Sequence, residues 1–436
     1  MKSRIAFPKS LILIALTLPI FLFSSDVFAA TLHVPSVDYP TIQSAIDAAN
    51  HFDTILVADG TYAGSGYKNI DFKGKAITVK SENGPDNCII DCGGDGRGFS
   101  FDSYEGSGSE VSGFTVTDGF AFNGGGFYFS NSSPTISNCI ITGNTATYGG
   151  GISLSEGSSP TFTNCIISSN TSYNNGGGVD YGTLSNNHPV FINCIVNNNT
   201  ANENGGGIYE NKNYSGSYGT FTNCIIKDNF SGRHGGGIYA AHSGTTLAGC
   251  TISGNRANNV GSNGGGMFIY SGSATVTNCI ITGNTANDVG GAMFLDFHAA
   301  PTITNCTITG NTAGLTAGGI YATGYFNPKV WNTILWADSP NEIYAESSSP
   351  EVHYSNVQGG FSGTGTIDSD PIFVGNGDYH LTSNEVVSPC IDTGRDYAPE
   401  LPSTDKDENA RSIGTRPDMG AYEFEQFAPT VSTGTA

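Results

Sequence analysis

Residues 277–294 read TNCIITGNTANDVGGAMF, and variants of this stretch recur along the chain. An asparagine follows each repeated cysteine by five residues, and a glycine cluster ends shortly afterwards in each copy. The repeated cysteines are Cys139, Cys165, Cys194, Cys224, Cys250, Cys279 and Cys306, spaced by 26, 29, 30, 26, 29 and 27 residues. The repeated positions keep their order within each copy, while the copies differ in length. This is typical of a repeat array in which the extra residues lie in loops.

Each copy contains short runs in which apolar and polar residues alternate, as expected for β-strands. In residues 304–308, Cys306 and Ile308 share one face while Thr307 takes the other. The residue two positions after each cysteine is always Ile or Val, so this face is predicted to be the interior. Without a helical period, a unit of this size closes one coil of a solenoid whose strands pair in parallel. The sequence predicts an all-β, right-handed, single-stranded parallel β-helix of about 11 coils.

The composition supports this fold and excludes others. Glycine makes up 60 of 436 residues, about twice the usual share, and charged residues only 13%. So much Gly argues against a helical bundle, and 38% hydrophobic residues argue against disorder. The net charge of −21 disfavours contact with phosphate backbones, so nucleic acid is excluded as a partner.

The chain divides into four predicted parts. Residues 1–29 resemble a secretory signal, with Lys2, Arg4 and Lys9 before an apolar stretch that is too short to span a bilayer. Residues 30–366 form the β-helix, capped by a helix over residues 41–50. Residues 367–426 lose the repeat and form a separate β-rich C-terminal element, and residues 427–436 are a polar tail. We expect a secreted protein with no later transmembrane segment.

The array cysteines are predicted to remain thiols. Neighbouring side chains in a parallel ladder lie about one strand spacing apart, farther than the 3.5–4.5 Å between Cβ atoms that a disulfide needs. Cys88, Cys92 and Cys390 lie outside this ladder, and the sequence leaves their pairing open.

These motifs resemble known families. The start, DYPTIQSAIDAANHFDTILVADGTY, looks like the N-terminal cap and first coil of the pectate-lyase-like superfamily of secreted right-handed parallel β-helix proteins. The GGGIY and NCIITGNTA copies are similar to repeats of polymorphic outer-membrane proteins. Residues 370–426 resemble the choice-of-anchor C-terminal domain of bacterial surface proteins. The resemblance implies a location at the extracellular or outer-membrane surface of a bacterium and leaves the activity open.

The candidate ligand-binding residues are the aromatic outward residues of the strand after each glycine cluster, Tyr128, Tyr209, Tyr239, Phe268, Phe294 and Tyr321. Because side chains alternate along a strand, the first residue after the glycine cluster, which is apolar, points inward and the next points outward. Six of the eight outward residues are aromatic. The outward set is Tyr128, Ser153, Asp180, Tyr209, Tyr239, Phe268, Phe294 and Tyr321. An exposed line of rings would stack against sugars, or it would stabilise the coils as a structural ladder. Strict alternation would point Glu210 inward, so the strand is expected to end before it.

Catalytic residues are harder to find. Lyase chemistry on acidic sugars needs a base and a cation, and residues 98–328 hold four Lys and Arg residues. Arg233 and His234 precede a glycine cluster and are a candidate base, although a solvated turn is the simpler interpretation. Hydrolysis needs two carboxylates on one face, and Asp180 has no second acid in the equivalent positions of adjacent coils. We therefore assign no catalytic residue.

Asp405, Asp407 and Asn409 place oxygen atoms at alternate positions, as at the start of a calcium loop. Glu408 stands where the anchor-domain pattern usually has Gly, which favours a solvated acidic loop. Calcium is a candidate cofactor, and none is required.

The sequence thus predicts a non-catalytic surface protein that binds a polysaccharide, a cell-surface glycan or a partner surface through an exposed aromatic stripe. The alternative is a pectate-lyase-like polysaccharide lyase or a glycoside hydrolase. Ligand identity, anchoring and oligomeric state remain open.

Overall fold

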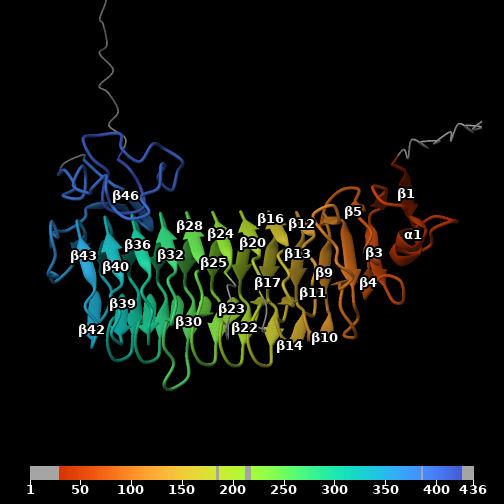
Figure 1. The fold of residues 1–436 in the computed structure, drawn as a ribbon, viewed down its shortest axis with the longest axis horizontal. Coiled ribbons are helices and arrows are strands. Elements are labelled where there is room, and N and C mark those ends of the chain that lie inside the picture. Colours follow the sequence, from red (N-terminus) through yellow and green to blue (C-terminus); the bar gives the residue numbers. More distant parts are fainter. Residues whose placement is uncertain (1–28, 183–185, 212–217, 384–385, 425–436) are drawn as a thin grey trace, which may run out of the picture.

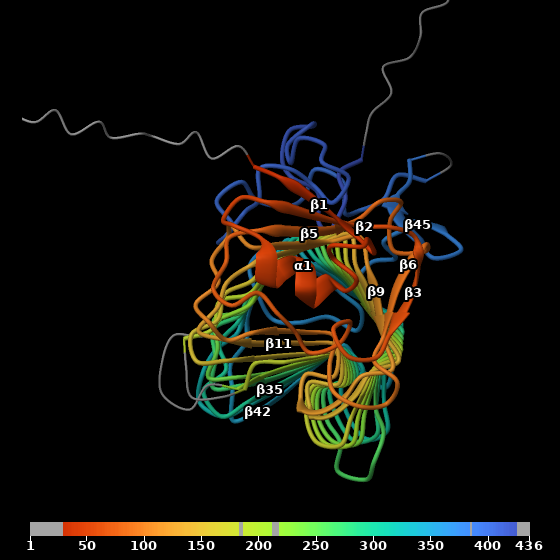
Figure 2. The ribbon, with the colours of Figure 1, turned by 90° about the vertical axis from the view of Figure 1, so that its right-hand side faces the viewer.

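The computed structural model describes residues 29–182, 186–211, 218–383 and 386–424. The predicted signal, apart from residue 29, and the polar tail lie outside these ranges. Within them the chain winds into a parallel β-solenoid, which Figure 1 shows from the side and Figure 2 along its axis.

Four parallel sheets, here named A to D, run along the solenoid. Sheet A comprises β1 (Thr31–Val34), β2 (Thr54–Val57), β5 (Thr78–Ser81), β8 (Glu110–Ser112), β12 (Thr135–Ser137), β16 (Thr161–Thr163), β20 (Val190–Ile192), β24 (Thr220–Thr222), β28 (Thr246–Ala248), β32 (Thr275–Thr277), β36 (Thr302–Thr304), β40 (Lys329–Trp331) and β43 (Glu351–His353). Sheet B comprises β3 (Gly60–Ala63), β6 (Cys88–Asp91), β9 (Thr115–Thr117), β13 (Ile140–Thr142), β17 (Ile166–Ser168), β21 (Ile195–Asn197), β25 (Ile225–Lys227), β29 (Thr251–Ser253), β33 (Ile280–Thr282), β37 (Thr307–Thr309), β41 (Ile334–Trp336) and β44 (Asn356–Val357).

Sheet C carries the predicted stripe. It comprises β4 (Ile70–Asp71), β7 (Phe99–Phe101), β11 (Phe127–Ser130), β15 (Ile152–Ser155), β19 (Val179–Asp180), β23 (Ile208–Asn211), β27 (Ile238–Ala241), β31 (Met267–Tyr270), β35 (Met293–Asp296), β39 (Ile320–Thr323) and β42 (Ile343–Glu346). Sheet D is shorter and comprises β10 (Phe120–Asn123), β14 (Thr145–Tyr148), β18 (Thr171–Ser172), β22 (Thr200–Ala201), β26 (Phe230–Ser231), β30 (Arg256–Ala257), β34 (Thr285–Ala286) and β38 (Thr312–Ala313). The 11 strands of sheet C among the described residues confirm the predicted number of coils.

The glycine clusters allow the turn between sheets D and C to stack on itself. Gly176 adopts a φ of +66°, a left-handed conformation that glycine tolerates best. A Cβ added to the next residue, Gly177, would lie 2.3 Å from the carbonyl oxygen of Gly206 in the following coil. Glycine is therefore required here both by backbone conformation and by the close approach of neighbouring coils.

The repeated asparagines form a buried hydrogen-bonded ladder. Asn229 is 1% exposed, and its Nδ2 donates to Asn255 Oδ1 at 2.9 Å and to the carbonyl oxygen of Val196 at 2.9 Å. Its Oδ1 accepts from the Nδ2 and the backbone N–H of Asn199, both at 3.0 Å. The ladder contains Asn144, Asn170, Asn199, Asn229, Asn255, Asn284 and Asn311, and ends on Asp338 Oδ1. A carboxylate suits the last position because it accepts without needing to donate.

The cysteines line the corner between sheets A and B inside the solenoid. All ten cysteines of the chain are buried free thiols, which confirms the prediction for the array and extends it to Cys88, Cys92 and Cys390. Cys224 Sγ lies 3.4 Å from the carbonyl oxygens of Phe191 and Thr222, so its S–H bonds to the backbone. Burial raises the pKa of the Cys88, Cys92 and Cys390 thiols to about 12.

The N-terminal end is closed by α1 (Ile42–Ala48), as predicted (Figure 2). Thr41 caps the helix in a capping box with Ser44, and Ile42 and Ile46 bury their side chains against the first coils. At 7 residues, the sole helix in the described part of the chain is too short to cross a bilayer.

The C-terminal element lies beside the last coils instead of extending the rod (Figure 1). Its regular structure in residues 367–383 and 386–424 is one antiparallel pair, β45 (Phe373–Gly375) and β46 (Asp378–Leu381), and a bridge between Thr404 and Ala410. Arg411 anchors it: the guanidinium donates to Glu423 Oε1 at 2.8 Å and to Asn278 Oδ1 of the solenoid corner. Both members of this ion pair are buried, so removing one would leave an uncompensated charge.

We predict that Asn229→Ala lowers the free energy of unfolding by about 3 kcal/mol, because it leaves donors and acceptors on two neighbouring coils unsatisfied. Thermal unfolding measures the effect. The exposed Asn258→Ala is the matched control and should change stability by no more than about 0.5 kcal/mol. Equal effects of the two variants would contradict the ladder's role.

Candidate functional site

The predicted aromatic stripe is a stacked ladder on the outer face of sheet C. Successive rings from Tyr209 to Tyr344 have centroids 5.0–5.3 Å apart and interplanar angles of 5–25°. This spacing follows from the parallel, in-register pairing of the strands that carry the rings. The prediction that these side chains point outward, made from the alternation along each strand, is therefore confirmed. The ladder extends one strand further than predicted, to Tyr344.

The prediction that these rings are exposed is wrong for three of them. Tyr209 is 8%, Phe268 4% and Phe294 7% exposed, because each ring uses its faces to stack on its neighbours. The His234 ring adds to the cover by stacking on Phe268 at 4.7 Å. Tyr239 and Tyr321 are partly exposed at their edges. A face that stacks on another ring cannot also stack on a sugar, so the ladder is primarily structural.

Tyr128 lies apart from the continuous ladder, since Ser153 and Asp180 occupy the two rungs between it and Tyr209. The Tyr128 hydroxyl lies 3.0 Å from Ser155 Oγ, and the Arg97 guanidinium sits 4.7 Å above its ring. Burial lowers the pKa of Arg97. Tyr128 is thus held by local partners and does not stack on the other five predicted rings.

Asp180 is a buried carboxyl on the outer face. It is 3% exposed, and Oδ1 accepts the backbone N–H of Gly182 at 3.1 Å. Its Oδ2 has no hydrogen-bond partner among the described residues, and burial raises the pKa to about 7. A carboxyl that holds a proton near neutral pH is a candidate acid or base, yet no second acid faces it from the adjacent rungs, which carry Ser153 and Tyr209.

An exposed aromatic surface lies at the turns from sheet C to sheet A, after the strands that carry the ladder, and the sequence reasoning missed it. Phe297 is 48%, Phe326 44% and Tyr325 87% exposed. Phe297 stacks on Tyr270 at 5.4 Å, and the His298 ring lies between Phe297 and Phe326, at 3.9 and 4.6 Å. The Asp-Phe-His and Gly-Tyr-Phe sequences at these turns were the available signal.

A second outward row of sheet C borders these turns. It is polar or aromatic on its last four rungs, which carry Tyr270, Asp296, Thr323 and Glu346. The Tyr321 hydroxyl donates to Glu346 Oε2, and burial and this carboxylate raise the pKa of Tyr321. The sheet C strands β23, β27, β31, β35, β39 and β42 contain no Lys or Arg, so this face is acidic. We name Asp296, Phe297, Phe326 and Glu346, with the Tyr325 ring, the turn platform.

Arg233 and His234 do not form a base site. Arg233 makes an exposed ion pair with Glu203 at 3.1 Å, and His234 Nδ1 accepts the backbone N–H of Asn263 at 3.2 Å. Burial lowers the pKa of His234, which stays a neutral packing group above the ladder. These contacts fit the simpler interpretation, in which this turn is structural and not catalytic.

The candidate calcium residues form a hairpin turn. Asp405 Oδ1 accepts the N–H groups of Asp407 and Asn409 at 2.9 and 2.8 Å, and Oδ2 accepts the N–H of Glu423 at 2.9 Å. Asp407 Oδ2 contacts His380 Nε2 at 2.8 Å. Burial alone would lower the pKa of His380, but its hydrogen bonds to Asp378 and Asp407 raise it overall. Both carboxylate oxygens of Asp405 and one of Asp407 thus already have protein partners.

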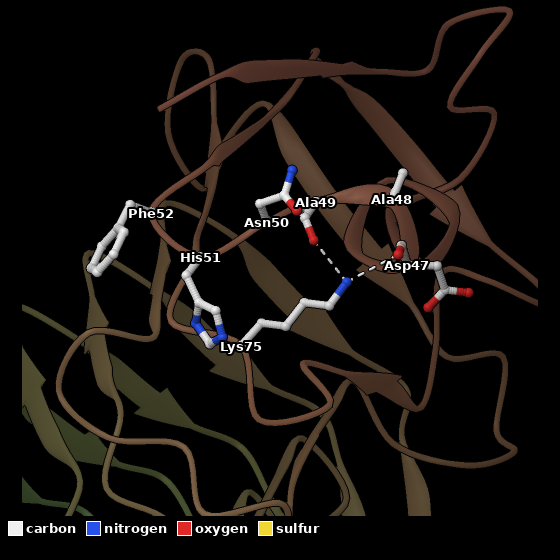
Figure 3. Close-up of a pocket in the computed structure, with 7 residues that line it drawn as sticks. All are labelled: Asp47, Ala48, Ala49, Asn50, His51, Phe52 and Lys75. Carbon is white, nitrogen blue, oxygen red and sulfur yellow. Dashed lines mark hydrogen bonds between the residues drawn. The ribbon is translucent and has the colours of Figure 1, made fainter. Parts of the chain in front are cut away.

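A hollow of about 600 Å³ lies beside the C-terminus of α1 (Figure 3). Lys75 Nζ donates to the carbonyl oxygens of Ile46, Asp47 and Ala49 at 2.7–2.9 Å, which uses all three of its protons and caps the helix. Asp47 in turn pairs with Lys73. The polar groups here serve the N-terminal cap.

Comparison with known proteins identifies the family. A family model described as "Right handed beta helix region" matches residues 45–232 and 213–386. The chain therefore belongs to the right-handed β-helix family, which confirms the predicted fold. No curated protein sequence matches the chain.

Solved structures share the architecture at low identity. Pectate lyase Pel9A is 17% identical with a TM-score of 0.52, and the match covers 91% of this chain and 96% of the lyase. The PL6 family alginate lyase AlyGC is 13% identical with a TM-score of 0.48, covering 86% of this chain and 60% of that one. A rhamnogalacturonan lyase is 13% identical with a TM-score of 0.45, covering 82% and 96%. At these identities the likeness concerns the fold alone.

Glu210 is a buried acid inside the solenoid. The strand β23 continues through Asn211, so Glu210 does point inward, contrary to the expectation that the strand ends before it. Its carboxyl accepts from the hydroxyls of Tyr181, Ser243 and Thr245. Burial raises its pKa to about 7, even though these hydrogen bonds oppose the shift.

This shift predicts a loss of stability as pH rises. Between the ordinary pKa of 4.5 and about 7 the folded protein binds more protons at Glu210 than the unfolded chain. The free energy of unfolding therefore falls with rising pH across this window, by about 3 kcal/mol at most. Glu210→Gln should be less pH-dependent than the wild type from pH 5 to 7. Parallel unfolding profiles for the two proteins would contradict the assignment.

Proposed function

We propose that the chain is a secreted, non-catalytic surface protein that binds an extended neutral polysaccharide along the turn platform. The observation that carries the proposal is the set of half-exposed rings on consecutive turns beside an outward row of carboxylates and hydroxyls. Aromatic surface packs against the apolar faces of sugars, while polar groups fix orientation through hydrogen bonds.

Charge supports a neutral ligand. Asp296 and Glu346 lie on this face, the last six strands of sheet C contain no Lys or Arg, and the chain carries a net charge of −21. A polyuronate would meet like charge along the whole surface, which disfavours its binding. The names of the lyases of similar fold say that they act on polysaccharides, which further supports a polysaccharide as the ligand.

The proposal separates two kinds of ring. A neutral glycan is first identified by array screening. The double variant Phe297→Ala, Phe326→Ala should lower the affinity for this glycan by roughly tenfold or more and leave the melting temperature unchanged. Phe268→Ala is the matched control from the ladder. It should lower the free energy of unfolding by about 3 kcal/mol and leave glycan affinity unchanged below the melting temperature.

The reverse pattern, with binding lost in Phe268→Ala and retained without Phe297 and Phe326, would overturn the assignment of the platform. Retained binding in both variants would place the ligand elsewhere on the molecule.

A polysaccharide lyase is the second candidate, favoured by the buried outward carboxyl of Asp180 in a fold shared with pectate lyase Pel9A. We expect no β-elimination on pectate or alginate, with or without calcium, because no basic side chain accompanies Asp180 on β15, β19 or β23. Absorbance of unsaturated products that grows with the wild type and disappears in Asp180→Asn would establish the lyase instead.

A further inference from the structure

Asparagine also occupies the corner between sheets A and B, directly before the array cysteines. It adopts a left-handed φ of 48–53° in seven coils, at Asn138, Asn164, Asn193, Asn223, Asn278, Asn305 and Asn332. Gly249, with a φ of +64°, takes this place in the coil between Asn223 and Asn278. In each of these seven coils one side-chain amide thus points outward along one edge of the solenoid, and the coil of Gly249 has none.

In the last coils these amides hold the C-terminal element. Asn278 Nδ2 donates to the carbonyl oxygen of Thr404 at 2.6 Å, Asn305 Nδ2 to Asp418 at 2.9 Å and Asn332 Nδ2 to Arg395 at 2.9 Å. The neighbouring outward residues of sheet B are buried under the element as well. Ile280 is 5%, Thr307 1% and Ile334 0% exposed. The element therefore docks on one amide and one outward sheet-B side chain per coil.

The same surface continues without cover over four earlier coils. The corner asparagines of these coils are exposed: Asn138, Asn164, Asn193 and Asn223. Asn164 Nδ2 donates to Asn138 Oδ1 at 3.4 Å. The matching isoleucines of sheet B are Ile140, Ile166 and Ile195, which are partly exposed, and Ile225, which is 37% exposed. An unbroken row of apolar side chains flanked by free amides is a surface suited to an interface.

We propose that this uncovered amide–isoleucine surface binds the C-terminal element of a second copy of the chain in a two-fold symmetric dimer. The element rises above the last coils of the solenoid and leaves the preceding coils on that side low, so the side view has the outline of a step (Figure 1). Two copies placed antiparallel fill each other's step, with the element of each copy resting on the uncovered coils of the other. The four coils from Gly249 to Asn332 under the element match the four uncovered ones in number.

The outer surface of the element has the complementary chemistry. With two short strands in its described residues, most of its backbone carbonyls lie outside a β-ladder, and several of these accept N–H groups of the element itself. It also exposes apolar side chains, including Val374 at 56%, Tyr397 at 62% and Ile413 at 42%. In a two-fold symmetric dimer the contact between the C-terminal element of one copy and the amide–isoleucine surface of the other occurs twice, which doubles the buried area.

Charge repulsion makes the dimer salt-dependent. Each copy carries a net charge of −21, and bringing two copies together is opposed by long-range repulsion that salt screens. Dimerisation should therefore strengthen as ionic strength rises, whereas a contact made by surface ion pairs would weaken.

Sedimentation equilibrium on the full chain tests the proposal. We expect a monomer–dimer equilibrium that Ile166→Lys with Ile195→Lys weakens by roughly tenfold or more, at an unchanged melting temperature. Val260→Lys is the matched control, because Val260 is 94% exposed on a loop away from this surface. It should leave dimerisation unchanged.

A photo-reactive residue at position 195 then locates the partner surface. We expect cross-links to residues 367–424 of the other copy. A monomer at every concentration and salt, a dimer unaffected by the double lysine variant, or cross-links from position 195 to the solenoid of the other copy would each overturn the proposal. The glycan proposal concerns sheet C and is unaffected by any of these outcomes.

Discussion

The parallel in-register stacking of coils is the constraint on which the structure depends. Each residue meets its equivalent in the next coil one strand spacing away, so every repeated side chain must be compatible with a copy of itself. Asparagine satisfies this condition because its amide donates on one side and accepts on the other. Phenylalanine and tyrosine satisfy it because their rings stack at 5.0–5.3 Å. Acidic residues do not, and the buried acids Glu210 and Asp338 each occur on a single rung.

The same constraint decides which surfaces remain available for binding. A ladder that is complete in itself, such as Tyr239 to Phe294, offers only edges to a ligand. Exposed ring faces occur at the turns after sheet C, where the repeat is interrupted. Exposed amides occur along the corner between sheets A and B, where the repeat continues and the C-terminal element does not cover it. Recognition in this fold therefore depends on surfaces that neither a ring ladder nor the C-terminal element has already used.

The sequence predicted the repeat better than its interruptions. Cys224 and Asn229 recur at fixed spacing, and their inward positions follow from alternation alone. Alternation also gave the outward direction of Phe268, but not its burial, because exposure depends on the ring in the next coil and on His234 above it. The docking of the C-terminal element on Asn278 and Asn305 joins residues more than 100 positions apart and leaves no local signal. The spacing of Asp405 and Asp407 suggested calcium, yet a hairpin uses the same oxygens.

Removal of one coil tests the stacking constraint most directly. Deleting residues 140–165 joins Cys139 to Ile166 and removes one repeat of 26 residues, so the ladders on both sides meet in register. This shortened protein should unfold cooperatively, with a melting temperature close to that of the wild type. Deleting residues 140–166 instead shifts the strand by one residue and turns its inward side chains outward, which should abolish the cooperative transition. Similar unfolding curves for the two deletions would contradict the account.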